Sequence, residues 1–231
     1  MKLVSINNLS FEIRENTTDE KVIPEVIGKN IYLKRPSIQI QAGEKWLDLG
    51  ANIGAFTVLA ASRGAEVTAF EPEQQNFDLL ENNIKLNKLT AKTVRAAVNA
   101  SGAPAKLYLC KTAQNKYRHT LKPIRGRSAI DVQIMSFAEV IRQYNPCGIK
   151  LDIEGAEIEI LDSNPELHNV ERIAMEYHFD HDYSVANFRN RMRIIEAQGF
   201  TTYYSAIPDT ILEYKFFPAS KIVIAIRNHG S

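Results

Sequence analysis

The sequence predicts an α/β protein built on a Rossmann-like, mostly parallel sheet of seven strands. Three observations support this fold class. Strand-like and helix-like runs alternate from residue 45 onward, a glycine-rich turn follows the first of these strands, and an acidic turn follows a later one. The 231 residues, 45% hydrophobic and 24% charged, suit one globular domain with a small appendage.

The first 42 residues are expected to form a small N-terminal β extension. Residues 2–14 alternate apolar and polar side chains around Asn7 and Asn8, a pattern typical of a hairpin. Residues 31–41 offer another short strand region. The main domain is therefore expected to span residues 43–231.

The main domain begins with two strand–helix pairs. We predict strands at 45–49 and 66–70, and helices at 53–63 and 73–88. The second helix is indicated by Phe77, Leu80 and Ile84, which recur near helical spacing after Pro72.

The remaining elements continue the alternation. Further strands are predicted at 92–98, 105–110, 131–135, 148–152, 170–177, 200–204 and 221–227, and helices at 136–144, 156–162 and 185–198. The last two strands are expected to close the sheet as an antiparallel hairpin. Residues 111–130 are polar, basic and turn-forming, which predicts a long loop or hairpin insertion.

The net charge is only +1, but it is unevenly distributed. Between Glu81 and Asp131 there are eleven Lys or Arg and no acidic residue. From Asp152 to Asp182 there are ten acidic side chains against the single Arg172. A basic wall and an acidic floor could therefore orient a substrate.

Nothing in the sequence indicates a disulfide framework or a membrane span. Cys110 and Cys147 lack metal-ligand spacing, and two thiols are too few for a disulfide-rich scaffold. No segment approaches eighteen uninterrupted apolar residues, and the N-terminus lacks a leader pattern. We expect a soluble, cytoplasmic protein with no membrane partner.

Residues 48–54, Asp-Leu-Gly-Ala-Asn-Ile-Gly, lie where an apolar strand meets a helix. Their glycines permit a tight turn and the close approach of a ligand, and the helix N-terminus favours a carboxylate. Glu71 ends the next strand, where it can accept hydrogen bonds from both hydroxyls of a ribose. An adenosine-containing cofactor is therefore expected.

The glycine spacing separates two such cofactors. Nicotinamide enzymes use G-x-G-x-x-G, whereas Gly50, Asn52 and Gly54 form G-x-N-x-G, which favours S-adenosyl-L-methionine. Asp48 either orients the turn or holds the methionine amino group, and Asn52 is either a contact or only a turn residue. The end of the third strand is expected near adenine. The predicted cofactor-binding residues are Asp48, Gly50, Asn52, Gly54, Glu71, Pro72, Ala97, Val98 and Asp152.

Residues 149–157, Ile-Lys-Leu-Asp-Ile-Glu-Gly-Ala-Glu, form an apolar strand that ends in acidic residues before another helix. This strand end should face the same crevice as the glycine turn. Over about residues 45–180 the sequence resembles the FkbM-type methyltransferases, which pair D-x-G-A-N-x-G with a later K-x-D-x-E-G-x-E segment. The resemblance implies a Class I methyltransferase fold acting on a hydroxyl of a sugar or secondary metabolite, with Asp152, Glu154 and Glu157 beside the active site.

A carboxylate at this strand end can accept the proton of a hydroxyl or hold the acceptor in line, and Asp152 is the first candidate. Glu154, Glu176 and His178 are further catalytic candidates, although a lone strand-end histidine is often structural. Glu157 either contacts the substrate or stabilises the first turn of the following helix.

Alternatives stay open for the acceptor and for a metal. The leading acceptor is a saccharide or other small polyhydroxylated molecule. The basic insertion could instead bind RNA or nucleotide phosphates, with Lys116 and Arg118 as substrate-binding residues. Carboxylates and His178 could coordinate a divalent cation, but nothing in their spacing specifies one. A noncatalytic binding protein that retains the fold is a third possibility, and the sequence does not specify an oligomeric state.

Overall fold

The centre of the protein is a mixed sheet of seven strands. The computed structural model describes residues 1–110, 119–179, 184–205 and 220–228. The strands are β3 (Lys45–Leu49), β4 (Glu66–Phe70), β5 (Lys92–Val94), β10 (Gly148–Leu151), β11 (Arg172–His178), β12 (Phe200–Tyr203) and β13 (Ser220–Arg227). Their spatial order is β12–β13–β11–β10–β3–β4–β5, and only the pairs made by β13 are antiparallel. The predicted parallel sheet with an antiparallel C-terminal hairpin is confirmed.

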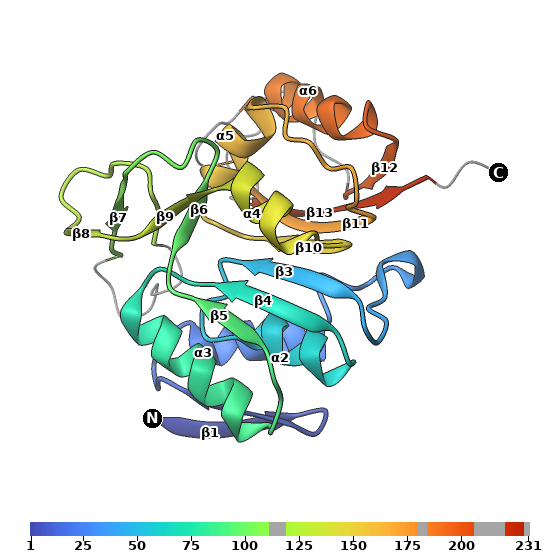
Figure 1. Cartoon of the computed structure of the whole chain (residues 1–231). Coiled ribbons are helices and arrows are strands. Elements are labelled where there is room, and N and C mark those ends of the chain that lie inside the picture. The colour runs from blue at the N-terminus through green and yellow to red at the C-terminus, as the bar shows by residue number, and fades with distance from the viewer. Residues whose placement is uncertain (111–118, 180–183, 206–219, 229–231) are drawn as a thin grey trace.

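Helices cover both faces of this sheet (Figure 1). One face carries α2 (Ala55–Ser62), α3 (Gln74–Leu86) and the N-terminal segment. The other carries α4 (Phe137–Tyr144), α5 (Ala156–Asp162) and α6 (Val185–Glu196). Each face has its own apolar core, with Trp46 and Phe56 in the first and Ile160 and Phe188 in the second. Burial on both faces explains why the central strands carry apolar side chains on each face, such as Trp46 and Leu47 of β3.

The N-terminal hairpin is present as predicted. Strands β1 (Lys2–Ile6) and β2 (Leu9–Ile13) pair antiparallel, and Asn7 and Asn8 have φ of 51° and 63°, as a two-residue hairpin turn requires. Helix α1 (Asp19–Ile23) and the π-helical turn η1 (Pro24–Gly28), which follow this hairpin, were not predicted.

The predicted strand within residues 31–41 is wrong. This segment forms turns and the 3₁₀ helix η2 (Pro36–Ile38). Pro36 has no amide for a strand ladder, and Asn30, at φ 51°, turns the chain just before the segment. The apolar residues here point into the core without forming a sheet.

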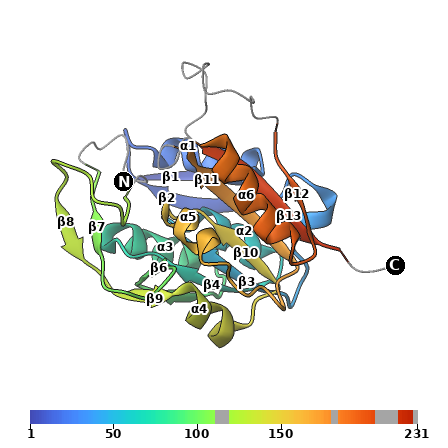
Figure 2. The ribbon, with the colours of Figure 1, turned by 90° about the horizontal axis from the view of Figure 1, so that it is seen from above.

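The strands predicted at 92–98 and 131–135 are each divided in two by a turn. Residues 92–98 yield β5 and a separate β6 (Ala97–Asn99), because the amide of Ala96 turns back to the carbonyl of Val94. Strand β6 pairs with β9 (Ile134–Ser136), while β8 (Ala129–Asp131) pairs with β7 (Lys106–Tyr108). Figure 2 shows the β7–β8 hairpin projecting at the end of the molecule opposite β12.

Among the described residues, no helix combines the length and apolar character needed to cross a membrane.

Candidate active site

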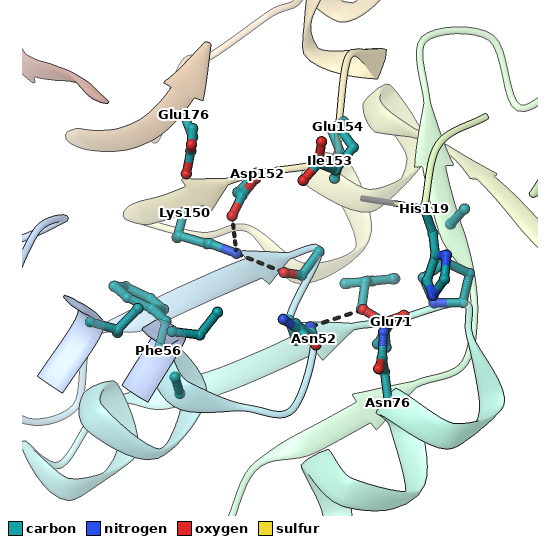
Figure 3. A pocket seen from close by; sticks show the side chains of 18 of the residues that line it. Asn52, Phe56, Glu71, Asn76, His119, Lys150, Asp152, Ile153, Glu154 and Glu176 are labelled. Carbon is teal, nitrogen blue, oxygen red and sulfur yellow. Dashed lines mark hydrogen bonds and ion pairs between the residues drawn. The ribbon is translucent and has the colours of Figure 1, made fainter. Parts of the chain in front are cut away.

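A cavity of about 330 Å³ lies at the carboxyl ends of β3, β4, β10 and β11 (Figure 3). Ligands of open parallel sheets bind at this edge. The predicted residues that line it are Gly50, Asn52, Glu71, Pro72, Ala97, Val98, Asp152, Glu154, Glu176 and His178. Asp48, Gly54 and Glu157 are not among the lining residues, and Lys116 and Arg118 lie outside the described residues. The glycine turn and the acidic strand end therefore share one cavity.

Both glycines of the turn occupy positions where a side chain would collide. Gly50 has φ +80°, and a Cβ there would lie 1.8 Å from the carbonyl oxygen of Asp152. Gly54, at φ +87°, precedes α2, and its Cβ would lie 2.7 Å from Leu80 Cδ1. The turn thus packs closely against the residue after β10 and against Leu80 of α3, and its positive φ angles favour glycine.

Glu71 faces the cavity from the end of β4 and is almost completely buried. Its carboxylate accepts hydrogen bonds from the amides of Asn52 (2.8 Å) and Glu73 (2.9 Å) and from the Asn76 side chain (3.4 Å). Burial raises the pKa of Glu71 to about 7, although these hydrogen bonds oppose the shift. A ribose whose hydroxyls donate to this carboxylate would favour its ionised form.

Lys150 joins the glycine turn to the acidic strand end, as Figure 3 shows. Its ammonium donates to the Gly50 carbonyl at 2.7 Å and lies 3.2 Å from Asp48 and 3.6 Å from Asp152. Asp48 is fully buried and also accepts from the Thr57 hydroxyl at 2.6 Å. Asp48 therefore supports the turn from below. A charged residue within the apolar run 149–151 was the available signal that Lys150 belongs to the site.

Tyr32 brings an unpredicted group into the site from the N-terminal segment. Its hydroxyl lies 2.9 Å from Asp152 Oδ2 and 3.2 Å from Glu176 Oε2, and it donates to one of them at a time. Burial, followed by the charges of these carboxylates, raises the pKa of Tyr32 well above its usual value. Burial and the charge of Asp152 likewise raise the pKa of Glu176, which also accepts from the Ser220 hydroxyl. Tyr32 is therefore a fixed donor to this pair of acids.

His178 lies at the end of β11 and is held from behind by Glu157. The Glu157 carboxylate contacts the ring Nδ1 and the backbone amide of His178, each at 2.9 Å. The ring Nε2 faces Glu154 at 3.4 Å and Asp152 at 3.9 Å. Burial lowers the pKa of His178, but these three carboxylates outweigh it and raise the pKa well above its usual value. Glu157 is fully buried, so its side chain supports His178 instead of reaching into the cavity.

Apolar side chains also line the cavity. Ala97, Val98 and Pro72 line the cavity, and the segment between β7 and β8 adds His119 and Leu121 beside Leu107 of β7. His119 Nδ1 accepts from the amide of Cys110 at 3.0 Å, which orients the ring. These apolar side chains are suited to contact a planar base.

Asp152, Glu154 and His178 have potential metal-ligand atoms that all lie within 4.8 Å of one another. Among the described residues, this is the one such cluster of three or more His, Cys, Asp or Glu side chains. Two carboxylates and an imidazole are suitable ligands for a divalent cation. Coordination would require a neutral His178, whereas the surrounding carboxylates favour its protonated form. A cation there would have to displace that proton.

The architecture is that of the class I Rossmann-like methyltransferases. A putative rRNA-methylase from Clostridium thermocellum is similar in fold with a TM-score of 0.51, at 8% identity over 95% of this chain and 99% of that chain. A tRNA (uracil-54, C5)-methyltransferase from Pyrococcus abyssi was solved with S-adenosyl-L-homocysteine. Its TM-score is 0.50 at 13% identity, over 97% of this chain and 44% of that chain. At such identities the likeness shows the fold alone.

The chain belongs to the FkbM methyltransferase family, because the model of the Methyltransferase FkbM domain matches residues 48–202. The sequence is also similar to Methyltransferase sdnD from Sordaria araneosa, at 27% identity over 157 residues. That alignment covers 53% of this chain and 61% of the relative, so the chain spans less than two thirds of the relative's length.

Proposed function

We propose that the protein is an S-adenosyl-L-methionine-dependent methyltransferase that methylates a hydroxyl of a saccharide or other small polyhydroxylated molecule. The observation that carries this proposal is the contact between the two motifs. Gly50 in the glycine turn packs against Asp152 at the acidic strand end, and Lys150 binds both. A donor held by the turn would thus lie beside the carboxylate that receives the acceptor.

The cavity is suited to each part of the methyl donor. Glu71 would accept hydrogen bonds from the ribose hydroxyls, and the apolar lining that includes Ala97 and Val98 would contact adenine. The backbone at Gly50, which leaves no room for a side chain, would approach the methionine portion. When bound, this cofactor supplies an electrophilic methyl group on a positively charged sulfur.

Asp152 would receive the proton that methylation releases. When the methyl group passes from the donor sulfur to the acceptor oxygen, the O–H bond would break and its proton would move to the Asp152 carboxylate. Tyr32 and Lys150 hold the other oxygen of this carboxylate, which fixes its direction. Holding the two reactants in this geometry would supply much of the rate enhancement.

The charge of the cavity favours a neutral acceptor. The acids Glu25, Glu71, Asp152, Glu154 and Glu176 line it and outnumber the cations Lys21, Lys150 and His178. This excess would repel a phosphodiester, whereas carboxylates accept hydrogen bonds from sugar hydroxyls. RNA is the second candidate, supported by the basic residues of the 111–130 insertion.

A labelling experiment distinguishes the saccharide acceptor from the RNA acceptor. Methyl-labelled donor is incubated with the protein and with separate glycan, small-metabolite and RNA pools. We expect label in the glycan or metabolite pool, reduced about 100-fold by Asp152→Asn. Label confined to RNA, and lost when Lys116→Ala is combined with Arg118→Ala, would replace the saccharide proposal with the RNA one.

A further inference from the structure

The N-terminal hairpin is attached to α3 by a row of asparagines. Asn83 and Asn87 each form two hydrogen bonds with the backbone of β2, through Glu12 and Ser10 respectively, at 2.7 to 3.2 Å. These side chains take the place of a neighbouring strand along the edge of β2. Asn76 lies seven residues before Asn83, about two turns earlier on the same side of α3, but it bonds a side chain instead of the backbone.

That side chain is Arg14, the residue after β2. Its Nη2 donates to Asn76 Oδ1 at 2.8 Å, and the Asn76 Nδ2 lies 3.4 Å from Glu71 Oε1. Arginine has only donors, so Asn76 must present its oxygen to Arg14 and its NH₂ group to Glu71. With the amide reversed, the Asn76 NH₂ group would face the Arg14 donors, and the Asn76 oxygen would face the Glu71 carboxylate.

Arg14 is itself fixed by Asp19, the first residue of α1. The guanidinium forms two bonds to the Asp19 carboxylate, at 2.7 and 2.9 Å, and the Arg14 amide adds a third at 3.0 Å. Asp19 is almost completely buried. Beyond it, Lys21, Val22 and Glu25 line the cavity, so this ion pair holds one of the cavity walls.

We propose that Arg14 is a positioning residue of the cofactor site, which orients the Asn76 amide toward Glu71 and couples the N-terminal wall to cofactor binding. This inference rests on the proposed function, because it takes Glu71 as the ribose ligand. Coupling is reciprocal: a cofactor bound to Glu71 stabilises residues 14–28, and loss of Arg14 weakens cofactor binding. Arg14 lies outside the region 48–202 that matches the family.

A double-mutant cycle tests whether Arg14 acts through Asn76. Calorimetric affinities for S-adenosyl-L-homocysteine are measured for wild type, Arg14→Gln, Asn76→Ala and the double variant. We expect each single variant to bind about fivefold more weakly, as for the loss of one typical hydrogen bond, and the double variant to match Asn76→Ala. Independent effects that multiply in the double variant, or unchanged affinity in Arg14→Gln, would overturn the proposal.

Two controls separate positioning from general destabilisation. Arg191→Gln removes a similar buried arginine, which holds Asp162 through two bonds of 2.7 Å away from the cavity, and should leave the affinity unchanged. If Arg14→Gln does not fold, Asp19→Asn replaces it in the cycle. In wild type the ligand should slow hydrogen exchange in residues 14–28, and in Asn76→Ala it should not; equal protection in both would contradict the coupling. A wild type that binds no ligand would instead refute the proposed function.

Discussion

Gly50 and Asp152 touch through their backbones, with no space between them for even one methyl group. Gly50→Ala should therefore abolish cofactor binding and lower stability beyond the roughly 1–2 kcal/mol cost of a left-handed alanine. Calorimetric titration and thermal unfolding measure the two effects. Gly43→Ala is the matched control, because Gly43 has the same φ of +80° and nothing within 4 Å of a Cβ. Equal losses in both variants would mean that the contact with Asp152 is unimportant.

Cofactor affinity should depend on the ionisation of Glu71. Its pKa is raised to about 7 by burial, and the ribose hydroxyls need the ionised carboxylate. Below pH 7 binding must first release a proton, so affinity should rise about tenfold from pH 6 to pH 8. Titrations of S-adenosyl-L-homocysteine over this range measure it. Glu71→Gln should bind weakly with no such dependence; an unchanged pH profile in this variant would assign the titration to another group.

Lys150 should contribute strongly to stability because Asp48 beneath it is fully buried. Lys150→Met leaves that charge without its cation and should cost about 3–5 kcal/mol in denaturant unfolding. Adding Asp48→Asn to Lys150→Met should recover part of the loss, since the uncompensated charge is removed. A double variant less stable than Lys150→Met would contradict the assigned pairing.

Glu157 should keep His178 protonated at neutral pH. In Glu157→Gln the pKa of His178 should fall, which ring NMR titration can follow. Because the folded pKa is raised, the stabilisation is present below the usual histidine pKa and is lost as pH rises through the folded value. The variant should therefore lose about 1–3 kcal/mol at pH 6 and less at high pH. Glu166→Gln, beside the exposed His168, should change neither quantity.

The glycine turn and the acidic strand end could be predicted because each is contiguous in the sequence and has its own spacing. Tyr32 could not, because it lies in a segment with strand-like polarity that folds into turns, and only tertiary contacts bring it to Asp152. Arg14 follows a hairpin that was predicted correctly, but only tertiary contacts bring it to Asn76. Glu157 was correctly expected beside the acidic strand end, but the sequence could not show that its side chain faces His178.

Calorimetric titration with S-adenosyl-L-methionine tests the central claim most directly. Wild type should bind one equivalent, and Glu71→Ala should bind about 100-fold more weakly, because it loses a buried carboxylate that accepts two charge-assisted hydrogen bonds. Absence of binding to wild type, or equal affinity in the two proteins, would contradict the assignment of this cavity as a methyl-donor site.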